Sequence, residues 1–174
     1  MNINGYVLFP TERLPEFFKA FHNGIYRKYA SQTPYIDFEA LTKDLATLYY
    51  TFPYSLTERI SFRIKREFEC QLSYDSYKHE RSGYSNRYTE LTTLAQADSF
   101  IKEIYAVCKE TFPLSYQSYQ LKDDDFKRII EQFGSIGSKY GTAYTVALTI
   151  SFFEECENID KYICANQKAE KKLA

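Results

Sequence analysis

Apolar and polar residues alternate along the segment from Ile60 to Tyr74 in the middle of the chain. Successive side chains of a β-strand point to opposite faces, so a period of two separates an apolar face from an ionic one. The apolar face consists of Ile60, Phe62, Ile64, Phe68, Cys70, Leu72 and Tyr74, and the polar face of Arg63, Lys65, Glu67, Glu69 and Gln71. Only Arg66 breaks the pattern, and a bulge or bend is expected there. The alternation predicts a half-buried antiparallel strand.

The same segment also supports a helical interpretation. Apolar residues recur every four residues at Leu56, Ile60, Ile64, Phe68 and Leu72, and the residues from Ser55 to Glu58 have the pattern of a capping box. A step of four residues drifts by about 40° per repeat on a helix of about 3.6 residues per turn, so these side chains would spiral around it. Phe62 and Tyr74 would lie off the stripe. We therefore prefer the strand.

Helical spacing of apolar residues predicts helices on both sides of this strand. They are expected at Leu14 to Tyr29, at Phe38 to Phe52 behind a cap at Asp37, at Leu94 to Phe112, at Phe126 to Phe133 and at Asn158 to Gln167. Further strands are expected at Asn4 to Phe9, Leu114 to Leu121 and Thr142 to Phe153, where for the last segment a buried helix is the alternative. The chain is thus predicted to be a single α+β domain over residues 1–174, a mostly antiparallel sheet covered on one face by about five helices. Residues 168–174 are expected to form a frayed tail.

Three of the six glycines lie between Gly134 and Gly141. The run Gly-Ser-Ile-Gly-Ser-Lys offers backbone amides, hydroxyls and a lysine, which are groups that bind phosphate. The spacing does not match a P-loop, and a predicted helix precedes it. We prefer a loop that ends the helix at Gly134, and an anion site remains the alternative.

Charge and composition narrow the classes of function. The net charge is −1, so no long-range electrostatic field indicates a nucleic-acid or membrane partner. The acidic run from Glu154 to Glu157 is interpreted as a solvated face. The 17 tyrosines favour a contact surface, since tyrosine is enriched at interfaces, and the alternative is that they fill half-buried positions as a result of coding bias. No Cys-x-x-Cys spacing occurs, and His22 and His79 lie far apart, so no metal and no cofactor are expected. Without a leader or an apolar run of about 18 residues, a cytoplasmic location is expected.

Basic residues and tyrosines interleave in a predicted loop from Tyr77 to Tyr88. Tyrosine and arginine dominate binding hot spots, so this loop is predicted to contact a partner protein through Tyr77, His79, Arg81, Tyr84, Arg87 and Tyr88. The function predicted from the sequence is that of a small non-enzymatic protein that binds and occludes a macromolecular partner. Inhibitors and immunity proteins encoded by phages or mobile elements are of this type.

Two other functions remain as alternatives. Nucleic acid could bind to the polar strand face through Arg59, Arg63 and Lys65 together with the same loop. A small enzyme using His79 or His22 ranks last, because no second catalytic group accompanies either residue. The oligomeric state does not follow from the sequence.

Overall fold

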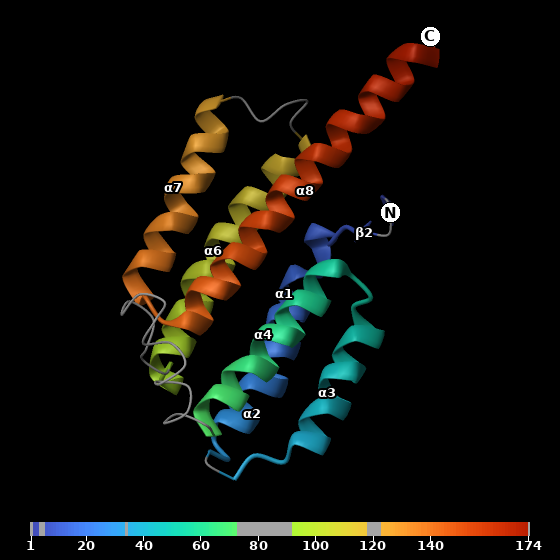
Figure 1. Cartoon of the computed structure of the whole chain (residues 1–174). Coiled ribbons are helices and arrows are strands. Elements are labelled where there is room, and N and C mark those ends of the chain that lie inside the picture. The colour runs from blue at the N-terminus through green and yellow to red at the C-terminus, as the bar shows by residue number, and fades with distance from the viewer. Residues whose placement is uncertain (1, 4–5, 34, 73–91, 118–122, 174) are drawn as a thin grey trace, which may run out of the picture.

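The chain folds into a bundle of helices (Figure 1). The computed structural model describes residues 2–3, 6–33, 35–72, 92–117 and 123–173, and nearly all of them are helical. Strand structure within these ranges is one antiparallel pair of two-residue strands, β1 (Asn2–Ile3) and β2 (Tyr6–Val7). The predicted α+β domain with a mostly antiparallel sheet is therefore wrong, and the predicted strand from Asn4 to Phe9 is reduced to β2.

The first helical rod runs from Thr11 to Ala30 and is built from four successive pieces. These are the 3₁₀ turn η1 (Thr11–Arg13), α1 (Leu14–Phe18), the π-helix η2 (Lys19–Tyr26) and α2 (Arg27–Ala30). Its buried side chains are Leu14, Phe17, Phe18, Phe21, His22, Ile25, Tyr26 and Tyr29. The predicted helix is confirmed here, and its π-helical segment is a feature that the sequence did not reveal.

Helix α3 (Phe38–Thr51) begins as predicted, because the side chain of Asp37 accepts a hydrogen bond from the Ala40 amide at 3.0 Å. Helix α4 (Ser55–Leu72) occupies the segment predicted to be the main strand. Leu56, Ile60, Ile64 and Phe68 are fully buried, whereas Phe62 is 60 % exposed. The apolar stripe can spiral around α4 because α3 packs against one side of this helix and α8 against another.

The second half of the chain forms α6 (Leu94–Gln117), α7 (Asp123–Tyr140) and α8 (Ala143–Leu173). The strand predicted from Thr142 to Phe153 is wrong. Its polar positions are hydroxyls that bond to the preceding turn of the same helix: Thr149 donates to the Thr145 carbonyl and Ser151 to the Ala147 carbonyl, both at 2.8 Å. Of the strand predicted from Leu114 to Leu121, residues up to Gln117 belong to α6 and the rest lie outside the described ranges.

Glycine ends α7 later than predicted. The helix continues through Gly134 and Gly137 to Tyr140, and Gly141 follows with a φ of 60°, a conformation that favours glycine. The Gly141 amide donates to the Gly137 carbonyl at 3.1 Å. Thr142 then caps α8, since its hydroxyl oxygen accepts from the Thr145 amide at 3.3 Å. The expected loop from Gly134 to Gly141 is wrong. Helix α8 is assigned as far as Leu173, and the fraying expected for residues 168–174 stays a prediction.

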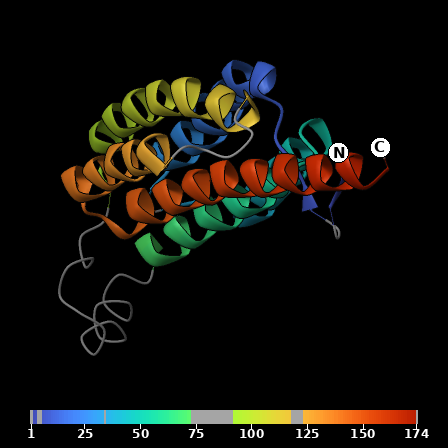
Figure 2. The same cartoon turned by 90° about the horizontal axis from the view of Figure 1, so that it is seen from above.

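Helix α8 is the central element of the bundle. It packs against α6, α7 and α4, and its C-terminal part extends beyond the other helices (Figures 1 and 2). The hairpin of α7 and α8 brings one face of α7 beside the N-terminal half of α8. In the described ranges, none of the helices has the length and apolar character needed to cross a membrane.

Candidate functional site

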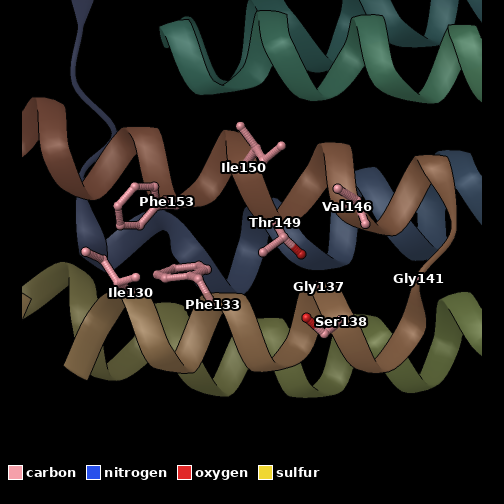
Figure 3. Close-up of a pocket in the computed structure, with 10 residues that line it drawn as sticks. Ile130, Phe133, Gly137, Ser138, Gly141, Val146, Thr149, Ile150 and Phe153 are labelled. Atoms are coloured by element: carbon pink, nitrogen blue, oxygen red, sulfur yellow. The ribbon is translucent and has the colours of Figure 1, made fainter. Parts of the chain in front are cut away.

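A groove of about 500 Å³ lies between α7 and α8 (Figure 3). Its apolar side chains are Ile130, Phe133, Val146, Ile150 and Phe153, and the remaining lining residues are Gly134, Gly137, Ser138, Gly141 and Thr149. None of these residues is ionisable. The groove is therefore an uncharged surface suited to apolar groups.

The glycines of α7 account for the hollow. A Cβ atom at Gly137 would lie 3.5 Å from Cγ2 of Thr149, which is ordinary contact, so the helices meet closely at this point. A Cβ atom at Gly134 would find no atom of another element within 4 Å. The missing side chain at Gly134 thus leaves open the space that a larger residue would fill.

Aromatic and aliphatic side chains shape the rest of the groove. The ring of Phe153 lies 5.9 Å from that of Phe133 and 6.2 Å from that of Phe126, measured between centroids. Ile130 on α7 is 44 % exposed and Ile150 on α8 is 46 % exposed. The other large apolar residues that are exposed in the described ranges are aromatic. Ile130 and Ile150 are therefore the two exposed aliphatic ones, and both line this groove. Exposed aliphatic residues gathered at one hollow indicate a binding surface.

Polar groups are few in the groove. The hydroxyl of Thr149 donates a hydrogen bond to the Thr145 carbonyl at 2.8 Å. Its proton is therefore engaged within α8 and is not available to a ligand. Ser138 is exposed on α7 and offers one further hydroxyl (Figure 3). A ligand would therefore gain mainly from burial of apolar surface, with at most a hydrogen bond or two to fix its orientation.

The glycine at position 134 allows a direct test of this geometry. We expect Gly134→Ala to raise the free energy of unfolding by about 0.4–1 kcal/mol, because alanine is the better helix former and the added methyl group enters open space. Urea denaturation followed by circular dichroism measures the change. A loss of stability would show that the space beside Gly134 is filled.

The residues predicted to contact a partner lie outside the described residues. These are Tyr77, His79, Arg81, Tyr84, Arg87 and Tyr88, all between positions 73 and 91. Their role stays a prediction. The groove was not predicted from the sequence, although the glycine cluster that forms one of its walls stands out there.

The basic strand face predicted to bind nucleic acid does not exist as such, because its three residues lie on helix α4. Arg59 and Arg63 are four residues apart and share a side of the helix, whereas Lys65 lies about 200° around from Arg63. The guanidinium of Arg59 pairs with Glu155 at 3.0 Å and with Glu154 at 3.4 Å. That of Arg63 lies 5.6 Å from the centre of the Phe62 ring. One of the three basic groups is thus engaged by carboxylates of α8.

Glu155, like Glu67 of the predicted polar strand face, is buried where the sequence predicted a solvated side chain. Its side chain is fully buried, not solvated, and it accepts hydrogen bonds from the Tyr6 hydroxyl at 2.5 Å, the Phe9 amide at 2.7 Å and Arg59 at 3.0 Å. Burial raises the pKa of the Glu155 carboxyl, although these donors and the charge of Arg59 act in the opposite direction. This cluster fastens the N-terminal segment to α8 and α4, which is a structural role.

His22, the histidine considered for catalysis, lies in η2 and is 5 % exposed. Its Nε2 lies 2.8 Å from Oδ1 of Asp98, and its buried Nδ1 has no hydrogen-bond partner in the described structure. Burial lowers the pKa of His22 and outweighs the opposing effect of Asp98. Within the ranges that the structure describes, no three His, Cys, Asp or Glu side chains are grouped to hold a metal ion.

Comparison of the chain with protein-family models, with curated proteins and with solved structures gives no significant match. The interpretation of the groove therefore depends on the chemistry of its own residues. That chemistry is mainly apolar and carries no charge.

Proposed function

We propose that the protein is a non-enzymatic binding protein that holds one amphipathic helix of a partner protein in the groove between α7 and α8. The observation that supports this proposal is the pair of exposed isoleucines, Ile130 and Ile150, beside an uncharged groove that a glycine keeps open. Apolar surface removed from water contributes roughly 25 cal/mol per Å². A partner that covers both isoleucines therefore gains affinity without having to satisfy a buried charge.

The length of the groove favours a helix as the occupant. Along α7 and the glycine that follows it, the lining residues extend from Ile130 to Gly141, which at about 1.5 Å per residue corresponds to about 16 Å. Three turns of a partner helix have the same length and present apolar residues at positions i, i+3 or i+4, and i+7. Such a complex would cover the apolar face of the partner helix and so prevent its other contacts, which is how an inhibitor or immunity protein acts.

We further propose that this binding takes place in the cytoplasm. Cys108 and Cys156 are buried thiols that form no disulfide bond in the structure. Thiols that stay reduced are the rule in that compartment.

Selection from a displayed library of helical peptides tests the proposal. Peptides enriched on the wild-type protein are expected to carry apolar residues at i, i+4 and i+7. Their affinity should fall at least a hundredfold for Gly134→Leu, because the leucine side chain occupies the open space. The matched control is Ser135→Leu, which adds the same side chain at the next, exposed position outside the groove and should leave affinity unchanged.

Two results would contradict the proposal. One is that no helical peptide is enriched over an unrelated bait. The other is that the selected peptides bind wild type and Gly134→Leu with equal affinity, which would place their site elsewhere. Circular dichroism of both leucine variants establishes that each retains its helical content before affinities are compared.

A further inference from the structure

A second pocket, of about 530 Å³, lies between the N-terminal rod and α6, away from the α7 and α8 groove. The rod contributes Pro15, Phe18, Lys19, His22, Asn23 and Arg27, and α6 contributes Asp98, Ile101, Lys102 and Tyr105. The lining differs in kind from that of the groove, since it includes three cations and one carboxylate. The two sites share no residue, so each can be tested separately.

The two ends of this pocket have different chemistry. The rings of Phe18 and Tyr105 lie 5.0 Å apart between centroids and form an apolar end. At the other end, Nε of Arg27 lies 3.5 Å from Oδ1 of Asp98, the same oxygen that lies 2.8 Å from Nε2 of His22. Position 19 of the rod and position 102 of α6 add two lysines to this lining. The arrangement therefore suits a ligand with an apolar body and a charged head.

The charge that remains in the pocket is positive. Asp98 is balanced by Arg27, and burial lowers the pKa of His22, so the two lysines are the groups left without compensation. Neither Lys19 nor Lys102 forms an ion pair with another described residue. The nearest acids in the sequence are engaged elsewhere, since Glu16 pairs with Arg13 at 3.1 Å and Glu103 with Lys139 at 2.6 Å. A chain of net charge −1 thus holds a pocket with an excess of two positive charges.

The backbone at this pocket is also unusual. Lys19, His22 and Asn23 belong to the π-helix η2, in which the Arg27 amide donates to the His22 carbonyl five residues earlier. Helices of this kind are rare and are frequently found at functional sites. Here η2 places its lysine, histidine and asparagine beside α6, while Tyr26 faces the core. This observation is independent of the charges.

We propose that this pocket binds a phosphate monoester that carries a flat apolar ring. The phosphate would lie between Lys19 and Lys102, with the terminal nitrogens of Arg27 within reach, and its two negative charges match the excess of two positive charges. The ring would lie against the half-buried ring of Tyr105, because Phe18 is 5 % exposed and already stacks on Phe152. The side-chain amide of Asn23 supplies a further hydrogen-bond donor.

Calorimetry and amide chemical shifts at low ionic strength test this proposal on the full chain. The probes are phenyl phosphate, adenosine 5′-monophosphate, inorganic phosphate and phenol. We expect the two ring-bearing phosphates to bind, and inorganic phosphate and phenol to bind at least tenfold more weakly than phenyl phosphate, because each lacks one half of the ligand. The stronger of the two ring-bearing phosphates identifies whether the pocket favours a simple aryl group or a nucleoside.

Charge-neutralising variants locate the site. Lys19→Gln and Lys102→Gln are each expected to weaken phenyl phosphate binding about tenfold, as loss of a charge-assisted contact does. Lys109→Gln, which neutralises an exposed lysine of α6 outside the pocket, should have no effect. The proposal is overturned if phenyl phosphate causes no saturable shifts at these residues up to millimolar concentration. It is also overturned if the Lys19→Gln and Lys102→Gln double variant binds as wild type does, or if inorganic phosphate binds as tightly as phenyl phosphate.

Discussion

Replacing Glu155 with alanine is expected to lower the free energy of unfolding by about 3–5 kcal/mol, which is the usual cost of breaking a buried ion pair by removing one partner. The fully buried Glu155 carboxylate accepts from the Tyr6 hydroxyl, the Phe9 amide and the Arg59 guanidinium. In the alanine variant the Phe9 amide would stay buried without an acceptor, and Arg59 would keep its hydrogen bond to the Ser151 carbonyl at 3.1 Å and its longer contact with Glu154. Urea denaturation followed by circular dichroism measures the loss.

A neighbouring glutamate provides the control. Glu157 lies on the same helix, its side chain is 30 % exposed, and it pairs with Lys161 at 3.9 Å. Glu157→Ala should change stability by no more than about 0.5 kcal/mol. Equal losses for Glu155→Ala and Glu157→Ala would show that the buried cluster does not fasten the N-terminal segment.

Replacing Phe68 with alanine should destabilise the fold to a similar extent, by about 3–5 kcal/mol. The Phe68 ring is fully buried. It stacks on the Tyr26 ring at 5.3 Å and lies 6.3 Å from the Tyr29 ring, both measured between centroids. Phe62→Ala, on the same helix, removes a ring that is 60 % exposed and should cost no more than about 0.5 kcal/mol. Thermal unfolding of the two variants under identical conditions gives the comparison.

This pair of variants distinguishes the helix from the strand predicted from the sequence. In a strand, Phe62 and Phe68 would lie on the same apolar face, and their replacement would cost similar amounts. On helix α4 they point in different directions, so their costs differ several-fold. Similar losses for both variants would contradict the helical assignment of residues 55–72.

Local signals correctly predicted several of the helices. The cap at Asp37 and the spacing of Leu41, Leu45 and Leu48 define α3 without reference to the rest of the fold. The rod from Leu14 to Tyr29 follows from the same periodicity. These predictions succeeded because each helix buries a single stripe, and the pattern of a single stripe is contained in about fifteen residues.

Two helices were predicted as strands because neighbours surround them on several sides. The buried stripe of α4 drifts around the helix between α3 and α8, so its period of four was interpreted as evidence against a helix. In α8, Thr149 and Ser151 look polar in the sequence, although their hydroxyls bond within the helix and they are buried. Alternation in the sequence therefore did not correspond to alternation in burial.

The candidate site could be predicted only in part. The cluster from Gly134 to Gly141 stands out in the sequence, but a glycine inside a helix costs only about 1 kcal/mol, which packing against α8 can offset. Whether such a run forms a loop or one wall of a groove depends on residues of α8 that lie close only in the folded chain. The burial of Glu155 could not be predicted for the same reason. The groups that donate hydrogen bonds to it belong to the N-terminal segment and α4, which lie close to α8 only in the folded chain.

The central claim is that the α7 and α8 groove holds a partner helix. It is tested most directly by nuclear Overhauser effects between a selected helical peptide and the protein labelled at its isoleucine methyl groups. The proposed function predicts contacts from the peptide to Ile130 of α7 and Ile150 of α8, which both line the groove. Contacts confined to other isoleucines, with the methyl signals of Ile130 and Ile150 unchanged at saturation, would contradict it.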